Sequence, residues 1–443
     1  MPIDYLRNEV RLIPFRIRMA WWVLKGGRQR LDGQISQTLA AGYPFTADMI
    51  PPEQIENHEN GFVALQHEFV DTDTGFLDKL RDQKEAAWNL EQASLPPNTK
   101  LFIEKARVVG SKTKLDAKRD LDQSFTGPSR EYSQLRAVMN SLAFESIHQA
   151  KFGDGSGALQ SLMLAQNVVR QLSSERSILG VIVYVSLHAW YYRAIANVAF
   201  ELRSDPLMQP KLLELVDAEL PEPDLDLMMK GEFYGCLAWL RNTNGYPRLK
   251  SQKPVDLEAW FEPFEPSTLV RTGVPTSTQG QFLLSELLRI LKEFELGPHP
   301  TGNWEKGLTQ WNHFIERPTP CYPNLSKPQF FGVRLQAFAA IKKRYVWREL
   351  ARFAVQTCFA HSDTLPGAVD SRPDIILGGT LRYKRIGRQM CFYSTGENRE
   401  DEGSPWLENG NPNPSRIDDM GMLLPNSDSF IPNIDAFFDA KDC

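Results

Sequence analysis

Two His-Glu pairs near the N-terminus carry side chains of the types that ligate zinc or transfer protons. The pairs are His58-Glu59 and His67-Glu68, nine residues apart. A zinc-protease motif needs two histidines four residues apart on one helix face. Nine residues correspond to about two and a half helical turns, which places the two pairs on opposite faces. We therefore expect no shared metal ion at these histidines.

A glycine-rich stretch, 153–157, contains a candidate nucleophile in Ser156. A serine nucleophile elbow, like a phosphate-binding loop, follows a strand and opens a helix. Both flanking patterns here are helical, so we expect an interhelical turn. His148 and His188 fall within predicted core helices, where a histidine is more often a satisfied core side chain than a base. The absence of a recognised catalytic motif in the sequence favours a protein that is not an enzyme.

The segment 12–25 combines basic, aromatic and apolar side chains, and two arginines interrupt the continuous apolar core that a signal peptide needs. The side chains expected to make contacts are Phe15, Arg16, Arg18, Trp21, Trp22 and Lys25. Such a helix can lie in a membrane interface, with its tryptophans at the headgroup level. The alternative, which we favour, is a helix docked on this chain or on a protein partner.

The composition is that of an ordinary globular protein. The chain has 443 residues, 42% hydrophobic and 24% charged, which is long enough to bury a large core. Its net charge of −5 gives no electrostatic reason to expect nucleic acid as a partner. The five cysteines form no CxxC pair, and the surroundings of Cys358 and Cys391 predict core positions. The most apolar window, 178–192, is too short to span a bilayer and predicts a buried helix.

Apolar residues recur at helical spacing through most of the chain. The clearest pattern covers 131–203, with short breaks at 153–157 and 173–175 that imply antiparallel neighbours. Further helices are predicted at 1–41, 53–70, 75–93, 207–218, 224–241, 280–295, 302–315 and 332–361. Residues 94–130 and 245–278 are polar or proline-rich and predict long connections. The predicted fold class is mainly α, built of antiparallel helical hairpins that form a tetratricopeptide-like array or a bundle.

Two short runs near the C-terminus predict a small antiparallel β element. They are 381–386 and 390–395, and Gly387-Arg388 between them has the spacing of a hairpin turn. The predicted division of the chain is a basic-aromatic helix over 1–41, a helical segment with a polar connection over 42–130, a helical core over 131–361, the hairpin with an acidic turn over 362–403 and an irregular tail over 404–443.

Two sets of motifs carry a resemblance to a known group of proteins. The first is Gly42-Tyr-Pro-Phe-Thr46, Pro51-Pro52 and Glu59-Asn-Gly61, and the second is Gly378–Arg385 with Tyr393–Gly403. In this order, they resemble a group of uncharacterised bacterial envelope proteins whose C-terminal hairpin is similar to the end of the type II secretion major pseudopilin. The resemblance implies a membrane-associated place in the bacterial cell envelope and no assigned activity. A cytoplasmic location is the alternative, because no signal peptide is visible.

The pseudopilin resemblance also implies a cation site. In pseudopilins the loop after the hairpin binds calcium, and the matching positions here are Glu397, Asn398, Glu400, Asp401 and Glu402. Calcium takes six to eight oxygen ligands, of which this turn supplies several. The alternative is a solvated acidic turn balanced by nearby arginines and lysines. The long apolar assembly helix of pseudopilins is missing from the sequence, so we do not expect a pilus subunit.

These observations predict a non-catalytic structural or interaction component of an envelope-associated protein assembly. The expected partner is another protein or a second copy of the chain, a membrane surface is a further candidate, and nucleic acid is not expected. One alternative is an enzyme of hydrolase type whose site is assembled from distant residues, since paired carboxylates meet only in the fold. The other is a calcium-dependent binding module. No cofactor apart from calcium is expected.

Overall fold

A computed structural model gives the fold. It describes residues 17–46, 49, 55–69, 93–95, 97–112, 114–115, 130–174, 178–224, 227–228, 230–231, 233–235, 237–238, 278–293, 333–396 and 420–425. Within these ranges the chain is mainly helical, with a small antiparallel sheet of four strands near the C-terminus. The predicted fold class is therefore confirmed.

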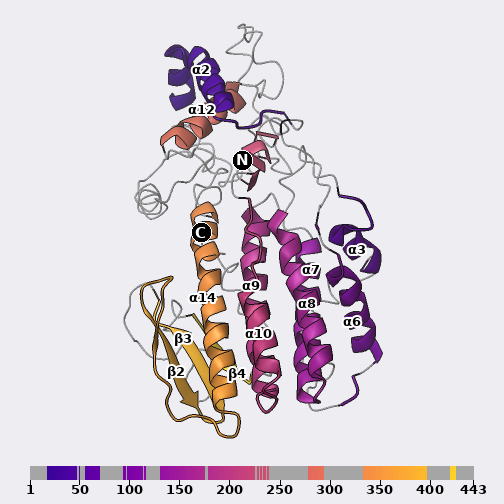
Figure 1. The fold of residues 1–443 in the computed structure, drawn as a ribbon. Coiled ribbons are helices and arrows are strands. Elements are labelled where there is room, and N and C mark those ends of the chain that lie inside the picture. The colour runs from indigo at the N-terminus through magenta and orange to yellow at the C-terminus, as the bar shows by residue number, and fades with distance from the viewer. Residues whose placement is uncertain are drawn as a thin grey trace, which may run out of the picture.

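The centre of the molecule is a set of long helices that lie side by side (Figure 1). They are α7 (Arg130–Lys151), α8 (Gly155–Gln171) and α9 (Ile178–Glu201), followed by α10 (Met208–Asp217) and α14 (Val333–Ala360). The turn after α7 contains Gly153, whose φ of 81° is in the left-handed region that glycine adopts freely. Asp154 then caps α8 by accepting a hydrogen bond from the backbone N–H of Gly157 at 2.8 Å.

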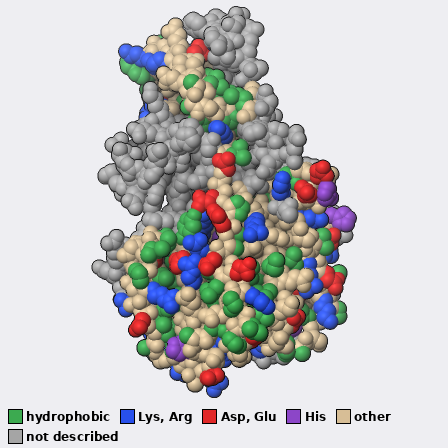
Figure 2. Space-filling view, in the orientation of Figure 1, with side chains coloured by type: hydrophobic (Ala, Val, Ile, Leu, Met, Phe, Trp, Pro, Cys, Tyr) green, Lys and Arg blue, Asp and Glu red, His purple; other side chains and the backbone are tan. Residues whose placement is uncertain are grey.

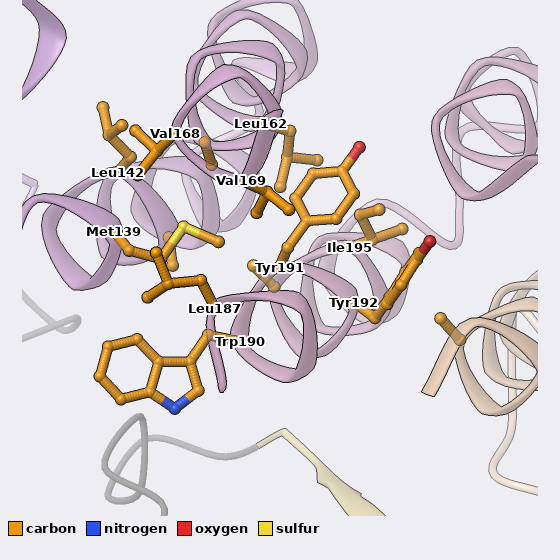
Figure 3. Close-up of a cluster of buried hydrophobic side chains, with 14 of the residues drawn as sticks. Met139, Leu142, Leu162, Val168, Val169, Leu187, Trp190, Tyr191, Tyr192 and Ile195 are labelled. Carbon is orange, nitrogen blue, oxygen red and sulfur yellow. The ribbon is translucent and has the colours of Figure 1, made fainter. Parts of the chain in front are cut away.

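Helix α9 is the element around which the others pack, because it contacts α7, α8, α10 and α14. Its sequence is apolar on every side, which is typical of a fully buried helix. The close-up of the core shows its large side chains between those of the neighbouring helices (Figure 3). The labelled residues are Met139, Leu142, Leu162, Val168, Val169, Leu187, Trp190, Tyr191, Tyr192 and Ile195. The predicted buried helix at 178–192 is thus confirmed.

Two further helices, α3 (Gly61–Glu68) and α6 (Pro97–Gly110), cover the outer side of α7 and α8 (Figure 1). Helix α3 begins later than the predicted 53–70, because the side chain of Asn60 caps it by accepting from the backbone N–H of Phe62. Helix α6 lies within residues 94–130, which the sequence predicts to be a long connection. The predicted helix at 302–315 lies outside the described residues, as do the predicted helix at 75–93 except residue 93 and the predicted connection at 245–278 except Thr278.

The sheet packs against α14 and α9 (Figure 1). Its strands are β1 (Arg372–Pro373), β2 (Thr380–Ile386), β3 (Gln389–Ser394) and β4 (Met420–Leu424), in the order β1-β2-β3-β4 and antiparallel throughout. The predicted hairpin is β2 and β3. Strand β4 falls within the segment predicted to be an irregular tail, and all five of its residues are buried.

One hydrophobic core connects these parts. It includes side chains from α3, α6, the five central helices and strands β2, β3 and β4. Phe353 of α14 and Phe392 of β3, for example, meet edge to face with ring centroids 5.2 Å apart. The sheet and the helical core therefore share their apolar interior.

Helices α2 (Gly27–Ala40) and α12 (Thr278–Glu293) form a pair at one end of the molecule (Figure 1). The preceding residues 17–24 are also helical, and residues 25–26 form a turn before α2. Helix α2 ends as the sequence predicts, since Gly42 follows its last turn with a φ of 83°.

Candidate functional site

The adjacent tryptophans of the N-terminal helix point in different directions. The side chain of Trp22 is buried, with 7% of its surface exposed, whereas Trp21 is 61% exposed. Consecutive residues of an α-helix lie about 100° apart around its axis, so one of two adjacent side chains can face a neighbouring helix while the other faces solvent. The two tryptophans therefore have separate roles.

Trp22 attaches helix 17–24 to the rest of the protein. Its indole N–H donates to the hydroxyl of Ser285 in α12 at 3.2 Å, and its ring meets Phe282 edge to face at 5.7 Å. The turn at 25–26 brings Gly27 beneath the same ring. A Cβ atom on Gly27 would stand 2.3 Å from the indole, so the close approach requires glycine.

Further contacts hold α2 against α12. Ser285 donates to the side-chain oxygen of Gln34 at 2.7 Å, and Arg28 donates to the hydroxyl of Thr278 at 2.7 Å. Apolar side chains of α2 are buried in the same interface, including Leu31 and Ile35. This packing fixes the orientation of helix 17–24.

The opposite side of helix 17–24 is exposed and apolar. Ile17, Trp21 and Leu24 are exposed by 62%, 61% and 78%, and their spacing of four and three residues places them on one side of the helix. Arg18 and Lys25 are also exposed, and the Lys25 ammonium lies 4.8 Å from the centroid of the Trp21 ring. We call these five residues the tryptophan face.

The tryptophan face lies in a strongly basic part of the chain. Residues 17–31 contain the four cations Arg18, Lys25, Arg28 and Arg30 and no acid, although the whole chain has a net charge of −5. The acceptors seen for two of these cations are uncharged, since Arg28 donates to Thr278 and Arg30 donates to the backbone oxygen of Lys25. In the space-filling view, basic and hydrophobic side chains adjoin at the outer edge of this end of the molecule (Figure 2).

The structure places some of the predicted contact residues on the exposed face and others elsewhere. Arg18, Trp21 and Lys25 lie together on the exposed face. Trp22 does not lie on that face, because its side chain contacts α12 of this chain. Ile17 and Leu24 are exposed neighbours that sequence reasoning did not select. Phe15 and Arg16 lie outside the described residues.

A second cluster of polar side chains lies where α14 passes α9 and the segment after α10. The buried guanidinium of Arg344 donates to the hydroxyl of Tyr184 at 2.7 Å and to that of Tyr345 at 2.6 Å. It also forms an ion pair with Glu222. Tyr184 in turn donates to the backbone oxygen of Pro221 at 2.7 Å. Burial alone lowers the pKa of Arg344, but its contacts with Tyr184, Tyr345 and Glu222 outweigh burial and raise the pKa above its ordinary value.

His188, which sequence analysis assigned to the core, lies beside this cluster. Its Nδ1 is 3.0 Å from the backbone oxygen of Tyr184, and its ring meets the Tyr184 ring at 4.2 Å. Burial, with a smaller effect of the nearby Arg344 charge, lowers the pKa of His188 to about 3. Burial raises the pKa of Tyr184 above its ordinary value. Neither group is poised to exchange a proton near pH 7, so the cluster has the properties of a structural network.

The same side of α14 carries two more arginines, one and two turns further along. Arg352 binds Glu349 through hydrogen bonds of 2.7 and 2.8 Å and also pairs with Asp217 of α10. Arg348 lies 3.6 Å from the same Glu349 carboxylate. Charges of both signs therefore alternate along this seam, and interspersed basic and acidic side chains are visible across the middle of the molecule (Figure 2).

The motif residues near the C-terminus have a structural role. The buried carboxylate of Asp374 accepts hydrogen bonds from the backbone N–H groups of Ile376 and Leu377 at 2.9 and 3.0 Å. It also accepts one from the hydroxyl of Ser394 in β3. Gly379 packs against the end of β3, because a Cβ there would stand 2.5 Å from the hydroxyl of Thr395. The Gly-Gly-Thr and Tyr-Ser-Thr-Gly motifs thus join the start of the hairpin to its end.

Other side chains with reactive groups lie in settings typical of structural residues. Ser156 is exposed in the first turn of α8. Cys358 and Cys391 are buried, as predicted, and burial raises the pKa of the Cys358 thiol to about 12. His67 is exposed beside Glu68.

Among the described residues, no group of three or more His, Cys, Asp and Glu side chains is arranged to hold a metal ion. The predicted calcium ligands, 397–402, lie outside those residues. None of the helices in the described ranges is both long and apolar enough to cross a bilayer.

Comparisons of the chain with protein families, curated proteins and solved structures find no match.

Proposed function

We propose that this protein is a non-catalytic interaction component of an envelope-associated assembly, and that the tryptophan face is one of its contact surfaces. The observation that carries the proposal is the division of the two tryptophans. Trp22 fixes helix 17–24 to α12, while Ile17, Trp21 and Leu24 remain exposed side by side. Isolated apolar side chains are normal on a protein surface, but a contiguous exposed set rimmed by charge is typical of a contact site.

The rigid attachment of this helix supports the same role. A contact surface binds more tightly when its side chains are held in place beforehand, because less conformational entropy is lost on binding. Trp22, Gly27 and Ser285 supply that support here, because their contacts hold helix 17–24 against α12.

The enzyme alternative has less support from the described residues. Among the described residues, the cluster centred on Arg344 combines buried arginine, tyrosine and histidine side chains with the more exposed carboxylate of Glu222. A general base or acid works best with a pKa near the working pH. Burial instead moves the pKa of His188 to about 3 and that of Tyr184 upward, which favours a role in holding α14 against α9.

The experiment is to measure the native size and location of the protein in the cells that produce it. We expect the wild-type chain to be recovered with the cell envelope, in a gently solubilised complex larger than its own mass of 50.5 kDa. The double variant Trp21→Ser, Leu24→Ser is expected to leave the complex, because it removes apolar surface without touching the buried side. Met163→Ser is the matched control, since Met163 is 56% exposed on α8. A wild-type protein that is monomeric and found away from the envelope contradicts the proposal.

A further inference from the structure

The chemistry of the tryptophan face identifies the kind of partner it fits. We propose that it binds the surface of a lipid bilayer that contains anionic headgroups, with Trp21 and Leu24 entering the boundary between headgroups and acyl chains. This inference rests on the proposed function, because it names the partner of the same surface.

The apolar surface of the tryptophan face is small. A specific protein interface buries about 800 Å2 on each partner, and one fully buried aromatic side chain contributes at most about 250 Å2. Ile17, Trp21 and Leu24, each partly exposed, supply only part of such an area. A bilayer has no such threshold, because each inserted apolar side chain adds to binding on its own.

The positive charge around the tryptophan face favours anionic lipid. Arg18 precedes Trp21 by three residues and Lys25 follows it by four, so both cations lie on the same side of the helix as the indole. With Arg28 and Arg30 they make four positive charges within residues 17–31, and the first acid after them is Asp32. A cluster of this sign next to a membrane attracts anionic lipid, whereas a second copy of the chain would present the same positive charge to it.

The side chains of Trp21 and Lys25 suit a membrane interface. Tryptophan is enriched at membrane interfaces, where its ring is apolar and its N–H stays hydrated. Lys25 extends over the ring of Trp21, with its ammonium 4.8 Å from the ring centroid. A lysine can cover apolar surface with its stem while its charge remains in the polar layer. This pair therefore suits a layer in which phosphate groups lie directly above hydrocarbon.

The position of the face allows contact with a flat surface. Helices α2 and α12 lie at one end of the molecule, away from the sheet (Figure 1). The exposed side chains of helix 17–24 therefore lie at that end of the molecule. The buried side of the helix stays on α12 through Trp22, so binding needs no rearrangement of the fold.

The test is co-sedimentation of the full chain with vesicles of phosphatidylcholine alone or of phosphatidylcholine mixed with phosphatidylglycerol. We expect at least about tenfold stronger binding to the mixed vesicles, from the combined attraction of several cations. Raising the salt concentration should weaken this binding, because salt screens exposed charges.

Single variants separate the two contributions. Trp21→Ala should reduce binding to the mixed vesicles about tenfold through lost insertion, and Lys25→Gln or Arg18→Gln should each reduce it about fivefold. The matched controls are Met163→Ala on α8 and Lys211→Gln on α10, which change an exposed apolar and an exposed basic residue elsewhere and should bind like the wild type. Thermal unfolding of each variant checks that the fold is intact.

The outcomes distinguish this inference from the proposed function. Equal binding to neutral and anionic vesicles, no binding to either, or variants that bind like the wild type would overturn the lipid proposal. If vesicle binding fails but the Trp21 and Leu24 variants still leave the native complex, the occupant is an acidic protein surface and the proposed function stands.

Discussion

At the scale of single residues, the structure shows how polar side chains are accommodated in an apolar helix. Two buried tyrosine hydroxyls on α9 have partners, since Tyr184 bonds to Pro221 and Arg344 while Tyr191 bonds to Gln166 and Leu215. A buried hydroxyl without a partner would cost about 1–3 kcal/mol. These contacts join α9 to α8, α10 and α14, and they explain why a helix this apolar still contains tyrosine and histidine.

Arg344 and its ion-pair partner should contribute unequally to stability. The Arg344 side chain is 5% exposed and donates to two hydroxyls, whereas the Glu222 side chain is 57% exposed and can be hydrated without its partner. We expect Arg344→Met to lower the free energy of unfolding by about 3 kcal/mol. Glu222→Gln should lower it by less than about 1 kcal/mol. Urea unfolding measures both, and equal losses would show that the ion pair, not the buried network, stabilises this seam.

His188 should make stability depend on pH below neutrality. Its pKa is about 3 in the folded protein, where burial disfavours the charged ring, and near its ordinary value in the unfolded chain. Between these two values the unfolded state binds a proton that the folded state does not. The free energy of unfolding therefore falls as the pH is lowered from about 6.5 towards 3, by up to about 1.4 kcal/mol per pH unit from this group.

The measurement is urea unfolding at several pH values with two histidine variants. His188→Asn keeps a donor for the Tyr184 carbonyl but removes the titrating ring, so the slope with pH should decrease by close to one proton. His67→Asn is the control, because the His67 side chain is 85% exposed, and its slope should match the wild type. An unchanged slope in His188→Asn would mean that this ring titrates normally in the folded state.

At the scale of elements, we predict opposite effects on stability when two glycines of α2 are replaced by alanine. Gly27→Ala places a methyl group 2.3 Å from the Trp22 ring, so the ring or the helix must move. We expect a loss of about 1–3 kcal/mol in the free energy of unfolding and faster hydrogen exchange in 17–40. Gly33→Ala is the matched control in the same helix, since nothing lies within 4 Å of its Cβ, and it should be neutral or stabilising by up to about 1 kcal/mol. Similar behaviour of the two variants would argue against the packing of Trp22 on Gly27.

The hairpin depends on one buried carboxylate. Asp374→Ala removes the acceptor of two backbone N–H groups and of the Ser394 hydroxyl, so we expect a loss of about 2–4 kcal/mol in the free energy of unfolding. Asp370→Ala changes an exposed aspartate four residues earlier and should alter it by less than about 0.5 kcal/mol. Thermal or urea unfolding compares the two. A small effect at Asp374 would mean that β1, β2 and β3 are held in place by the apolar contacts of the sheet alone.

At the scale of the whole molecule, local patterns predict much of the fold. The apolar run at 178–192, the glycines at 153–157 and the Gly387-Arg388 turn each specify an element through neighbouring residues, and each element is present. Strand β4 was not predicted, because Met420–Leu424 is a short apolar run amid Pro, Asn and Asp and becomes a strand only by pairing with β3. The Arg344 cluster joins residues 122 and 160 positions apart, a distance over which sequence spacing carries no information.

The tryptophan face was also predicted only in part from the sequence. A basic and aromatic helix near the N-terminus is visible in the sequence, including Arg18, Trp21 and Lys25. Which of the two tryptophans stays exposed is decided by α12, whose Ser285 lies 263 positions from Trp22. The exposed Ile17 and Leu24 follow once that side is known, because helical spacing then places them with Trp21.

The central claim is that the tryptophan face is covered by a membrane or another protein in the cell. Hydroxyl-radical footprinting of the unaltered chain tests this claim directly. Oxidation of Trp21 is compared between the purified protein and the native envelope fraction, with the exposed Met163 and the buried Trp22 as internal references. The account predicts that Trp21 is oxidised in the purified protein and protected in the envelope, while Met163 reacts in both and Trp22 in neither. Equal oxidation of Trp21 in the two samples would contradict it.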